Sequence, residues 1–524
     1  MKGIFVTLCT CFVTLLQAQQ ADIIIRNGRI LDGTGNSWYY ADIAVKDGKI
    51  ISIGKLQNMV AATSIDAKGL YIAPGFIDVH THIEGNEKIA PDASSFIYDG
   101  VTSVVTGNCG GSAADIGKYL QFIDSLQLSI NVATLYGHNT VRNLVMGTAN
   151  RLPTAAEQQQ METLVAQAMQ AGAVGLSTGL IYIPGTYSKT PEVAGLAKIA
   201  AQYNGLYATH MRDEGDHVTD AIEEALTIAR AANIPLEISH FKLSGQNNWN
   251  RSKETLAMVK HAREEGIEVT IDQYPYTASS TTLAQLFPDE VLADGADSIR
   301  ARIRNPATRA YIKKHMLERL HKRMLSHFTY CQIASYSADS TWNGKNIEEV
   351  NLMLGRKHTA AEEAETIIDM IYNGGASMVF HGMSEDDVKN IMQYPFNMFA
   401  SDASIRVYMS GVPHPRGYGT NARVLGKYVR EEKVISIEEA IRRMTSLPAQ
   451  KFGLTNRGLL KEGMAADIVV FDAATIIDRS TYAQPHQYSQ GMQYVLVNGK
   501  LVVENGKHNG NRPGKALYGA GKMQ

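Results

Sequence analysis

The sequence predicts an α/β protein in which a (β/α)8 barrel of the TIM type carries a small β-sandwich domain built from both chain ends. Short strand-like segments joined by Asn-Gly and Asp-Gly turns open the chain, and the same texture returns near its end. Between them, apolar strands alternate with helical stretches. The predicted β-sandwich parts are residues 21–72 and 455–516, and the predicted barrel is residues 73–454.

Eight short apolar segments in the middle of the chain are candidates for the barrel strands. Helical stretches lie between them: Thr154 and Glu157 form a capping box, apolar residues follow at helical spacing, and Gly172 ends that helix. Strands that alternate with helices form parallel sheets, and such a barrel holds its active site at the carboxyl ends of its strands. The candidate strands are residues 75–79, 101–105, 130–135, 174–177, 206–209, 236–239, 269–272 and 398–400.

The stretch between the seventh and eighth candidate strands, residues 281–393, is too long for a single loop. Within it, residues 310–320 carry a helical pattern. We expect this stretch to be an insertion that folds over the mouth of the barrel as a lid.

The composition is that of a folded globular protein. Of the 524 residues, 44% are hydrophobic and 19% are charged. Lys and Arg number 50 against 52 Asp and Glu, for a formal net charge of -2. A nucleic-acid binder needs a basic surface, so this balance argues against that class. It neither favours nor excludes self-association, and the oligomeric state is left open.

The first residues have the pattern of a secretory signal peptide. Met1-Lys2 is a short basic start, residues 4–16 form an apolar run, and Ala18 supplies a small residue at the cleavage position. We therefore predict a signal peptide over residues 1–18 and a periplasmic or secreted protein. The apolar run is shorter than the ~20 residues that a spanning helix needs, so we expect no membrane span.

The four cysteines do not form a disulfide framework. Cys9 and Cys11 lie within the predicted signal peptide, so the mature chain would keep Cys109 and Cys331. Those two would be available to pair in an oxidising compartment unless Cys109 binds a metal.

Residues that bind metals stand at the ends of five candidate strands. Taken alone, each is more often a packed histidine, a small buried cysteine or an aspartate that caps a helix. Together, at the rim where such a barrel holds its chemistry, they predict a metal site. The six residues are His80, His82, Cys109, His210, His240 and Asp402.

These positions lie within motifs that resemble a known family. Residues 74–82, Pro-Gly-Phe-Ile-Asp-Val-His-Thr-His, resemble the first barrel strand of the amidohydrolase superfamily, which ends in His-x-His. Further motifs, spread over residues 22–516, resemble more narrowly the N-acyl-D-amino-acid deacylases, or D-aminoacylases. These motifs are Gly107–Gly110, Gly137–Arg142, Gly175–Gly179, Tyr207–Glu214, Ile238–Lys242, Asp272–Tyr276, His414–Thr420 and Lys461–Asp467.

The resemblance implies a zinc enzyme. Many amidohydrolases bridge two metals through a carbamylated lysine on strand four, but residues 174–180 contain no lysine. The thiolate of Cys109 can take that bridging role. Whether one or two zinc ions are bound is left open. The resemblance assigns a tightly bound zinc ion to Cys109, His210 and His240, and a second, weaker position to His80, His82 and Asp402.

The resemblance also implies hydrolysis of the amide bond of N-acyl-D-amino acids, which gives a carboxylate and a free D-amino acid. A zinc-activated water would attack the carbonyl, with Asp402 as the general base and then the general acid for the leaving nitrogen. Such a small-molecule substrate carries a carboxylate, which suits a cation and phenolic donors. The candidates for that contact are Lys242, Tyr182, Tyr274 and Arg406.

Two other interpretations stay open. One is a cyclic-amide hydrolase of the hydantoinase or dihydroorotase type, or another hydrolase of carboxylate-bearing amides or dipeptides. Cyclic-amide hydrolases usually carry the bridging lysine that is absent here. The other is a catalytically inactive module that binds ligands or partners, against which the presence of Asp402 and the histidines argues. Residues 83–85, Ile-Glu-Gly, depart from the acidic pair expected after His82, so we expect a different acyl or side-chain preference.

Overall fold

The structure is a computed structural model that describes residues 20–523. The predicted signal peptide, residues 1–18, lies outside the described residues. Helices and strands both occur throughout the described chain, which confirms the predicted α/β class. None of the helices among the described residues combines the length and the apolar character that crossing a membrane requires.

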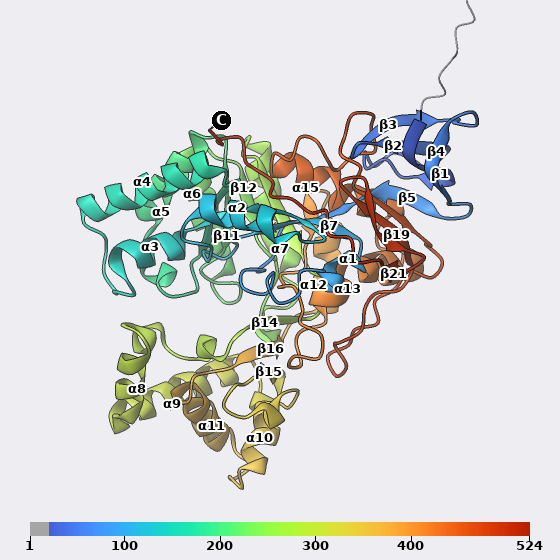
Figure 1. Cartoon of the computed structure of the whole chain (residues 1–524). Helices are drawn as coiled ribbons and strands as arrows, with labels where there is room; N and C mark the ends of the chain where they lie inside the picture. The colour runs from blue at the N-terminus through green and yellow to red at the C-terminus, as the bar shows by residue number, and fades with distance from the viewer. Residues whose placement is uncertain (1–19, 524) are drawn as a thin grey trace, which may run out of the picture.

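Strands from both chain ends share one nine-stranded sheet, seen at the right of Figure 1. The two ends meet where β5 pairs antiparallel with β18. The sheet runs in the order β21-β20-β19-β18-β5-β1-β2-β3, and β4 pairs with β1. Its strands are β1 (Gln20–Ile30), β2 (Tyr39–Lys46), β3 (Lys49–Gly54), β4 (Val60–Asp66), β5 (Tyr71–Pro74), β18 (Ile468–Phe471), β19 (Met492–Val497), β20 (Lys500–Glu504) and β21 (Lys507–His508).

The turn signals in this sheet are correct in two places and wrong in one. Asp47 and Gly48 both have positive φ and join β2 to β3, as Asp-Gly hairpin turns do. Asn498 and Gly499 join β19 to β20 in the same way. Asn27-Gly28, predicted as a turn, lies inside β1, where the register against β2 shifts. The left-handed Asn27 therefore makes a bulge and not a turn, because the strand continues on both sides.

Parallel strands occupy the middle of the chain at the predicted positions. The third predicted strand is divided into two short ones, β8 and β9. One sheet contains β6 (Phe76–Asp78), β7 (Val101–Thr106) and β8 (Asn131–Thr134). The other contains β9 (Tyr136–Gly137), β10 (Gly175–Gly179), β11 (Leu206–His210), β12 (Leu236–Ile238), β13 (Val269–Gln273) and β17 (Asn397–Phe399).

Backbone contacts join these two sheets at both edges. The amide of Val174, just before β10, donates to the carbonyl of Thr134 in β8 at 2.9 Å. On the other side, Thr81 after β6 forms a parallel bridge with Ala403 after β17. The carboxyl ends of all these strands therefore lie along one common rim.

Helices follow most of these strands, and α4, α5, α6 and α7 contact one another in that order. Thr154 and Glu157 form the predicted capping box of α4, and Gly172 ends it with a φ of 114°. The helices in this part are α1 (Ser94–Ile97), α2 (Ile116–Leu126), α3 (His138–Met146), α4 (Ala155–Ala171), α5 (Thr190–Ala201), α6 (Val218–Ala232), α7 (Ser252–Glu264), α12 (Glu385–Met392), α13 (Arg416–Arg423), a π-helix (Val424–Glu431), α14 (Ile437–Met444) and α15 (Ser446–Lys451).

The stretch between β13 and β17 folds around its own apolar core, below the parallel strands in Figure 1. Its three strands form an antiparallel sheet in the order β14-β16-β15. Helix α12 returns to the main core through Val388 and Ile391. The elements are β14 (Ala278–Thr282), α8 (Ala296–Arg304), α9 (Pro306–Lys322), β15 (Cys331–Ser335), α10 (Ile347–Met353), α11 (Ala360–Tyr372) and β16 (Ser377–His381).

Short 3₁₀ turns complete the described elements. They occur at Gly185–Tyr187, Gln246–Asn248, Leu283–Leu286, Asp289–Leu292, Phe328–Tyr330 and Ser340–Trp342.

A buried carboxylate connects the end sheet to the parallel strands. Asp467 forms an ion pair with Arg457, and both side chains are about 5% exposed or less. It also accepts a hydrogen bond from the amide of Asn498 at 2.7 Å and one from the side chain of Asn131, in β8, at 3.2 Å. One side chain therefore holds segments that are far apart in the sequence.

Replacing Asp467 by alanine would leave the Arg457 guanidinium buried without its partner, which costs about 3–5 kcal/mol. We expect the variant to unfold at a clearly lower urea concentration than the parent protein. Replacing the exposed Glu504 of β20 by alanine is the matched control and should change stability by less than about 0.5 kcal/mol. Equal unfolding midpoints for all three proteins would contradict this connection.

Candidate metal centre

The six predicted metal residues converge on the common rim. His80 and His82 follow β6, Cys109 follows β7, and His210 is the last residue of β11. His240 follows β12 and Asp402 follows β17. Their donor atoms fall into overlapping groups: one joins Cys109 to His80 and His240, and another joins Asp402 to His80 and His82.

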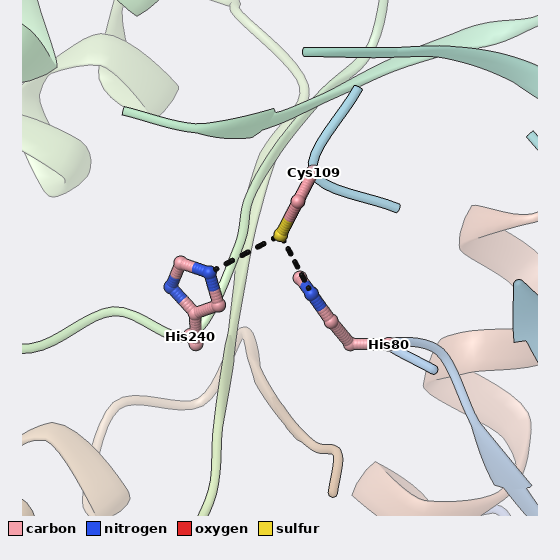
Figure 2. A group of neighbouring side chains, drawn as sticks. All are labelled: His80, Cys109 and His240. Carbon is pink, nitrogen blue, oxygen red and sulfur yellow. Dashed lines mark hydrogen bonds between the residues drawn. The ribbon is translucent and has the colours of Figure 1, made fainter. Parts of the chain in front are cut away.

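The sulfur of Cys109 lies among three imidazoles. It is 3.2 Å from Nε2 of His80, 3.5 Å from Nδ1 of His210 and 3.6 Å from Nε2 of His240. Figure 2 shows the sulfur pointing between His80 and His240. Ligands of a tetrahedral zinc ion lie about 3.5 Å from one another, given zinc–ligand distances of ~2.0–2.3 Å. The spacing of these donors therefore fits a zinc ion.

Asp402 lies beside the other pair of histidines. Its Oδ1 is 3.3 Å from Nε2 of His82 and 3.6 Å from Nε2 of His80. His80 thus faces both Cys109 and Asp402, and it is closer to the sulfur. A carboxylate and two imidazoles also form a suitable donor set for zinc.

Three of the six residues sit in the left-handed backbone region that non-glycine residues rarely adopt. Their φ angles are 52° at Cys109, 35° at His240 and 49° at Asp402. Each is the second or third residue beyond the end of a strand, so the chain turns sharply there and directs the side chain across the rim. Strain of this kind costs ~1–3 kcal/mol per residue and clusters at functional sites.

Two buried carboxylates contact the imidazole nitrogens that face away from the Cys109 sulfur. Asp272 lies 3.4 Å from Nδ1 of His80, and Glu214 lies 2.9 Å from Nδ1 of His240. Glu214 is also 3.6 Å from Nε2 of His210. Each imidazole therefore offers one nitrogen to the sulfur and the other to a carboxylate, the arrangement that fixes the tautomer of metal-binding histidines.

The sequence reasoning did not single out Asp272 and Glu214. Both lie inside motifs that it quoted, since Glu214 ends Tyr207–Glu214 and Asp272 begins Asp272–Tyr276. A carboxylate four residues after a metal histidine, as Glu214 is after His210, is the signal that was available.

The charges of the site stabilise the ionised forms of its acids. Burial alone would raise the pKa of Cys109, but the charge of His80 and the hydrogen bonds of the imidazoles hold that pKa well below its usual range. Burial would likewise raise the pKa of Asp402, but Arg416 and His80 hold it well below the ordinary value. Both groups are therefore ready to act as anionic ligands.

The substrate candidates Lys242, Tyr182 and Tyr274 line one cavity together with His210 and Asp402. Lys242 does not stand free, because its Nζ lies 2.5 Å from Glu214 Oε1 and 2.8 Å from His240 Nδ1. The hydroxyl of Tyr182 contacts that of Thr281, in β14, at 3.1 Å. The insertion thus contributes directly to this cavity.

The structure separates Arg406 from the other substrate candidates. Arg406 packs against Gly417 and is absent from the cavity lining. Arg416 is not part of the cavity lining either, but it contacts two residues that are: its Nη1 is 2.9 Å from Asp402 Oδ2, and its guanidinium carbon is 4.4 Å from the ring centre of Tyr274. Arg416 belongs to the quoted motif His414–Thr420, which brings the chain back to the rim.

Glu84, where the chain departs from the expected acidic pair, supports the loop of Cys109. Its carboxylate accepts a hydrogen bond of 2.8 Å from the amide of Gly107. The segment that departs from the expected acidic pair therefore lies next to the metal site, and its one glutamate holds the loop that carries Cys109.

The family model named Amidohydrolase family matches residues 63–503. The chain therefore belongs to the amidohydrolase family. It is 34% identical over 522 residues to an N-acyl-D-aspartate deacylase and 33% identical over 524 residues to a D-aminoacylase, both from Alcaligenes xylosoxydans xylosoxydans. These alignments cover 95% of this chain in each case, and 95% and 98% of the relatives.

A solved structure of N-acyl-D-glutamate deacylase from Bordetella bronchiseptica has the same fold, with a TM-score of 0.82 and 35% identity. The match covers 95% of this chain and 100% of that one. That protein was crystallised with zinc and a phosphonate inhibitor that mimics the tetrahedral intermediate of the reaction.

Zinc bound at Cys109 should protect its thiol from alkylation. After chelation, we expect Cys109 to react with iodoacetamide near neutral pH much faster than Cys331, whose pKa burial raises to about 12. Readdition of zinc should suppress the reaction at Cys109. Mass-spectrometric peptide mapping measures both rates, and a Cys109 rate that is indifferent to zinc would argue against ligation.

Proposed function

We propose that this protein is a zinc-dependent hydrolase that converts N-acyl-D-amino acids into a carboxylate and a free D-amino acid. One observation carries the proposal: a cysteine and three histidines from separate strand ends meet within 3.2–3.6 Å at the sulfur, backed by carboxylates. Similarity over nearly the whole chain to deacylases of N-acyl-D-amino acids supports the substrate class.

Two sets of residues would hold zinc. Zinc, when bound, lowers the pKa of water and polarises an amide carbonyl. The strand β10 reads Gly-Leu-Ser-Thr-Gly, so no lysine is available there to bridge two ions. The sulfur of Cys109, which lies near His80 as well as near His210 and His240, would take that place. The first set is Cys109, His210 and His240, and the second is His80, His82 and Asp402.

Asp402 would move the proton. Its carboxylate stands at the cavity and is ionised at neutral pH, so it can accept a proton from the attacking water. An amide nitrogen leaves only when it is protonated, and Asp402 would deliver the proton to it. The ion pair with Arg416 keeps Asp402 weakly basic. A substrate carboxylate that draws on the charge of Arg416 would strengthen Asp402 as a base at the moment of binding.

The α-carboxylate of the substrate would bind between the catalytic aspartate and the phenols. Tyr182 and Tyr274 line the cavity, where their hydroxyls contact Thr281 and the sulfur of Met383 and would turn to the substrate. Lys242 supplies a buried cation, and Arg416 adds a guanidinium beside Asp402. Arg416 replaces Arg406 in this proposal, because Arg416 forms an ion pair with Asp402, which lines the cavity, whereas Arg406 forms none among the described residues.

Further parts of the proposal concern the arrangement and location of the chain. The bridges between the two parallel sheets support an eight-stranded barrel that carries the β-domain of both ends. The N-terminal sequence pattern supports export through a cleaved signal peptide to the periplasm or the medium.

A panel of substrates separates this proposal from the alternatives. We expect the zinc-loaded protein to hydrolyse N-acetyl-D-amino acids, to act poorly on their L-enantiomers, and to leave hydantoin and dihydroorotate intact. Chelation should abolish activity and zinc should restore it. Hydrolysis of the cyclic amides alone would favour the hydantoinase interpretation, and no hydrolysis of any compound would favour an inactive binding module.

Replacing Asp402 by asparagine tests its role in proton transfer. We expect kcat to fall by at least ~100-fold, the low end of a general acid–base contribution, while the zinc bound at Cys109, His210 and His240 is retained. Glu504→Ala, far from the site on β20, is the control. A variant with normal zinc content and near-normal turnover would remove Asp402 from the mechanism.

A further inference from the structure

The insertion contributes two arginines to the cavity of Asp402. Arg319 lies in α9 and Arg323 directly follows it, and both line the cavity, of about 90 Å³, together with His210 and Asp402. Both also line an adjoining cavity of about 410 Å³. The pair therefore stands where the catalytic cavity opens into a larger space.

Neither guanidinium forms an ion pair with a carboxylate among residues 20–523. Arg319 donates one hydrogen bond, of 2.7 Å, to the carbonyl of Gln285. The guanidinium of Arg323 lies 5.4 Å from the ring centre of Tyr330. Burial, and then the charge of Arg323, lower the pKa of Arg319. Asp213 and Asp289 act on Arg319 in the opposite direction, through space and without an ion pair. Two neighbouring cations thus stand in a partly desolvated place without a carboxylate of the described chain in contact, and a bound anion would relieve their repulsion.

The acidic residues around the adjoining cavity make their direct contacts with groups other than the two arginines. Asp216 pairs with Lys322 at 2.6 Å, and Asp213 accepts the amide of Gly215 at 2.7 Å. Asp289 accepts the hydroxyl of Thr186 at 2.8 Å, and Glu290 accepts that of Tyr311 at 2.5 Å. None of these four carboxylates neutralises the arginine pair by direct contact.

The cations nearer the metal residues are also compensated. Lys242 pairs with Glu214, and Arg416 pairs with Asp402. A substrate with a single carboxylate can be held on that side, next to the reacting amide. The two arginines would then remain without a carboxylate from the described residues in contact, which leaves a place for a second negative charge.

We infer that Arg319 and Arg323 form a subsite for the side-chain carboxylate of an acidic substrate, N-acyl-D-glutamate or N-acyl-D-aspartate. This inference rests on the proposed deacylase function. Two guanidinium forks suit a carboxylate, which they can bind through paired hydrogen bonds. The apolar neighbours Leu286 and Phe380 limit water in the cavity and strengthen that attraction.

Sequence identity alone does not choose this substrate. The chain is 34% identical to an N-acyl-D-aspartate deacylase, 35% to an N-acyl-D-glutamate deacylase and 33% to a protein named only D-aminoacylase. The choice comes from the two arginines at the cavity, neither of which has a carboxylate within residues 20–523 in contact.

The experiment compares two substrates that differ only in side-chain charge, N-acetyl-D-glutamate and N-acetyl-D-glutamine, with N-acetyl-D-aspartate as a shorter acid. The parent protein should prefer the acids over the neutral amide by ~10- to 100-fold in kcat/KM. Arg319→Gln, Arg323→Gln and the double variant should lose that preference mainly through KM. Their kcat/KM for N-acetyl-D-glutamine should stay within about threefold of the parent value, which also shows that they fold.

Lys314→Gln is the matched control, because Lys314 lies on the same helix, is exposed and pairs with Glu318. It should leave both substrates unchanged. Equal losses for glutamate and glutamine substrates in the arginine variants would overturn the inference, since they would place the α-carboxylate on this pair. A parent protein that hydrolyses neutral substrates as well as acidic ones would also overturn it. Failure to hydrolyse any N-acyl-D-amino acid would instead refute the proposed function itself.

Discussion

The site depends on the hydrogen bonds between the candidate metal-binding histidines and two buried carboxylates. A histidine offers the correct nitrogen to a metal only if its other nitrogen has a fixed partner. Asp272 supplies that partner for His80, and Glu214 supplies it for His240. Asp272 belongs to β13 and also accepts a hydrogen bond from the backbone amide of His240. The alignment of neighbouring strands therefore sets the orientation of these imidazole rings.

Much of the fold was predictable because it follows from local rules. The short apolar segments between helical stretches predicted the parallel strands, and a capping box predicted the start of α4. The same rules failed at Asn27-Gly28, since a left-handed residue serves equally well in a turn and in a bulge, and only the partner strand decides between them. The domain boundaries inferred from the sequence stay predictions.

The residues of the candidate site that lie at strand ends could be predicted from the sequence. The residues that reach the site from segments far away in the sequence could not. All six metal candidates meet, because strand order fixes their rim. Arg406 was chosen for its nearness to Asp402 in sequence, yet the chain leaves the rim after Asp402 and comes back at Arg416. The sequence did not indicate that Arg319 and Arg323 line the cavity, since no local pattern reveals that α9 reaches it.

The insertion has an apolar core separate from that of the parallel strands. The side chains that it presents to the cavity and the metal residues therefore belong to parts of the chain with different cores. In evolutionary terms, recognition and chemistry are held in different modules of one chain. Mutations in α9 can alter what the enzyme accepts while the hydrolytic machinery stays intact, so substrate range can diverge quickly among proteins that share one reaction.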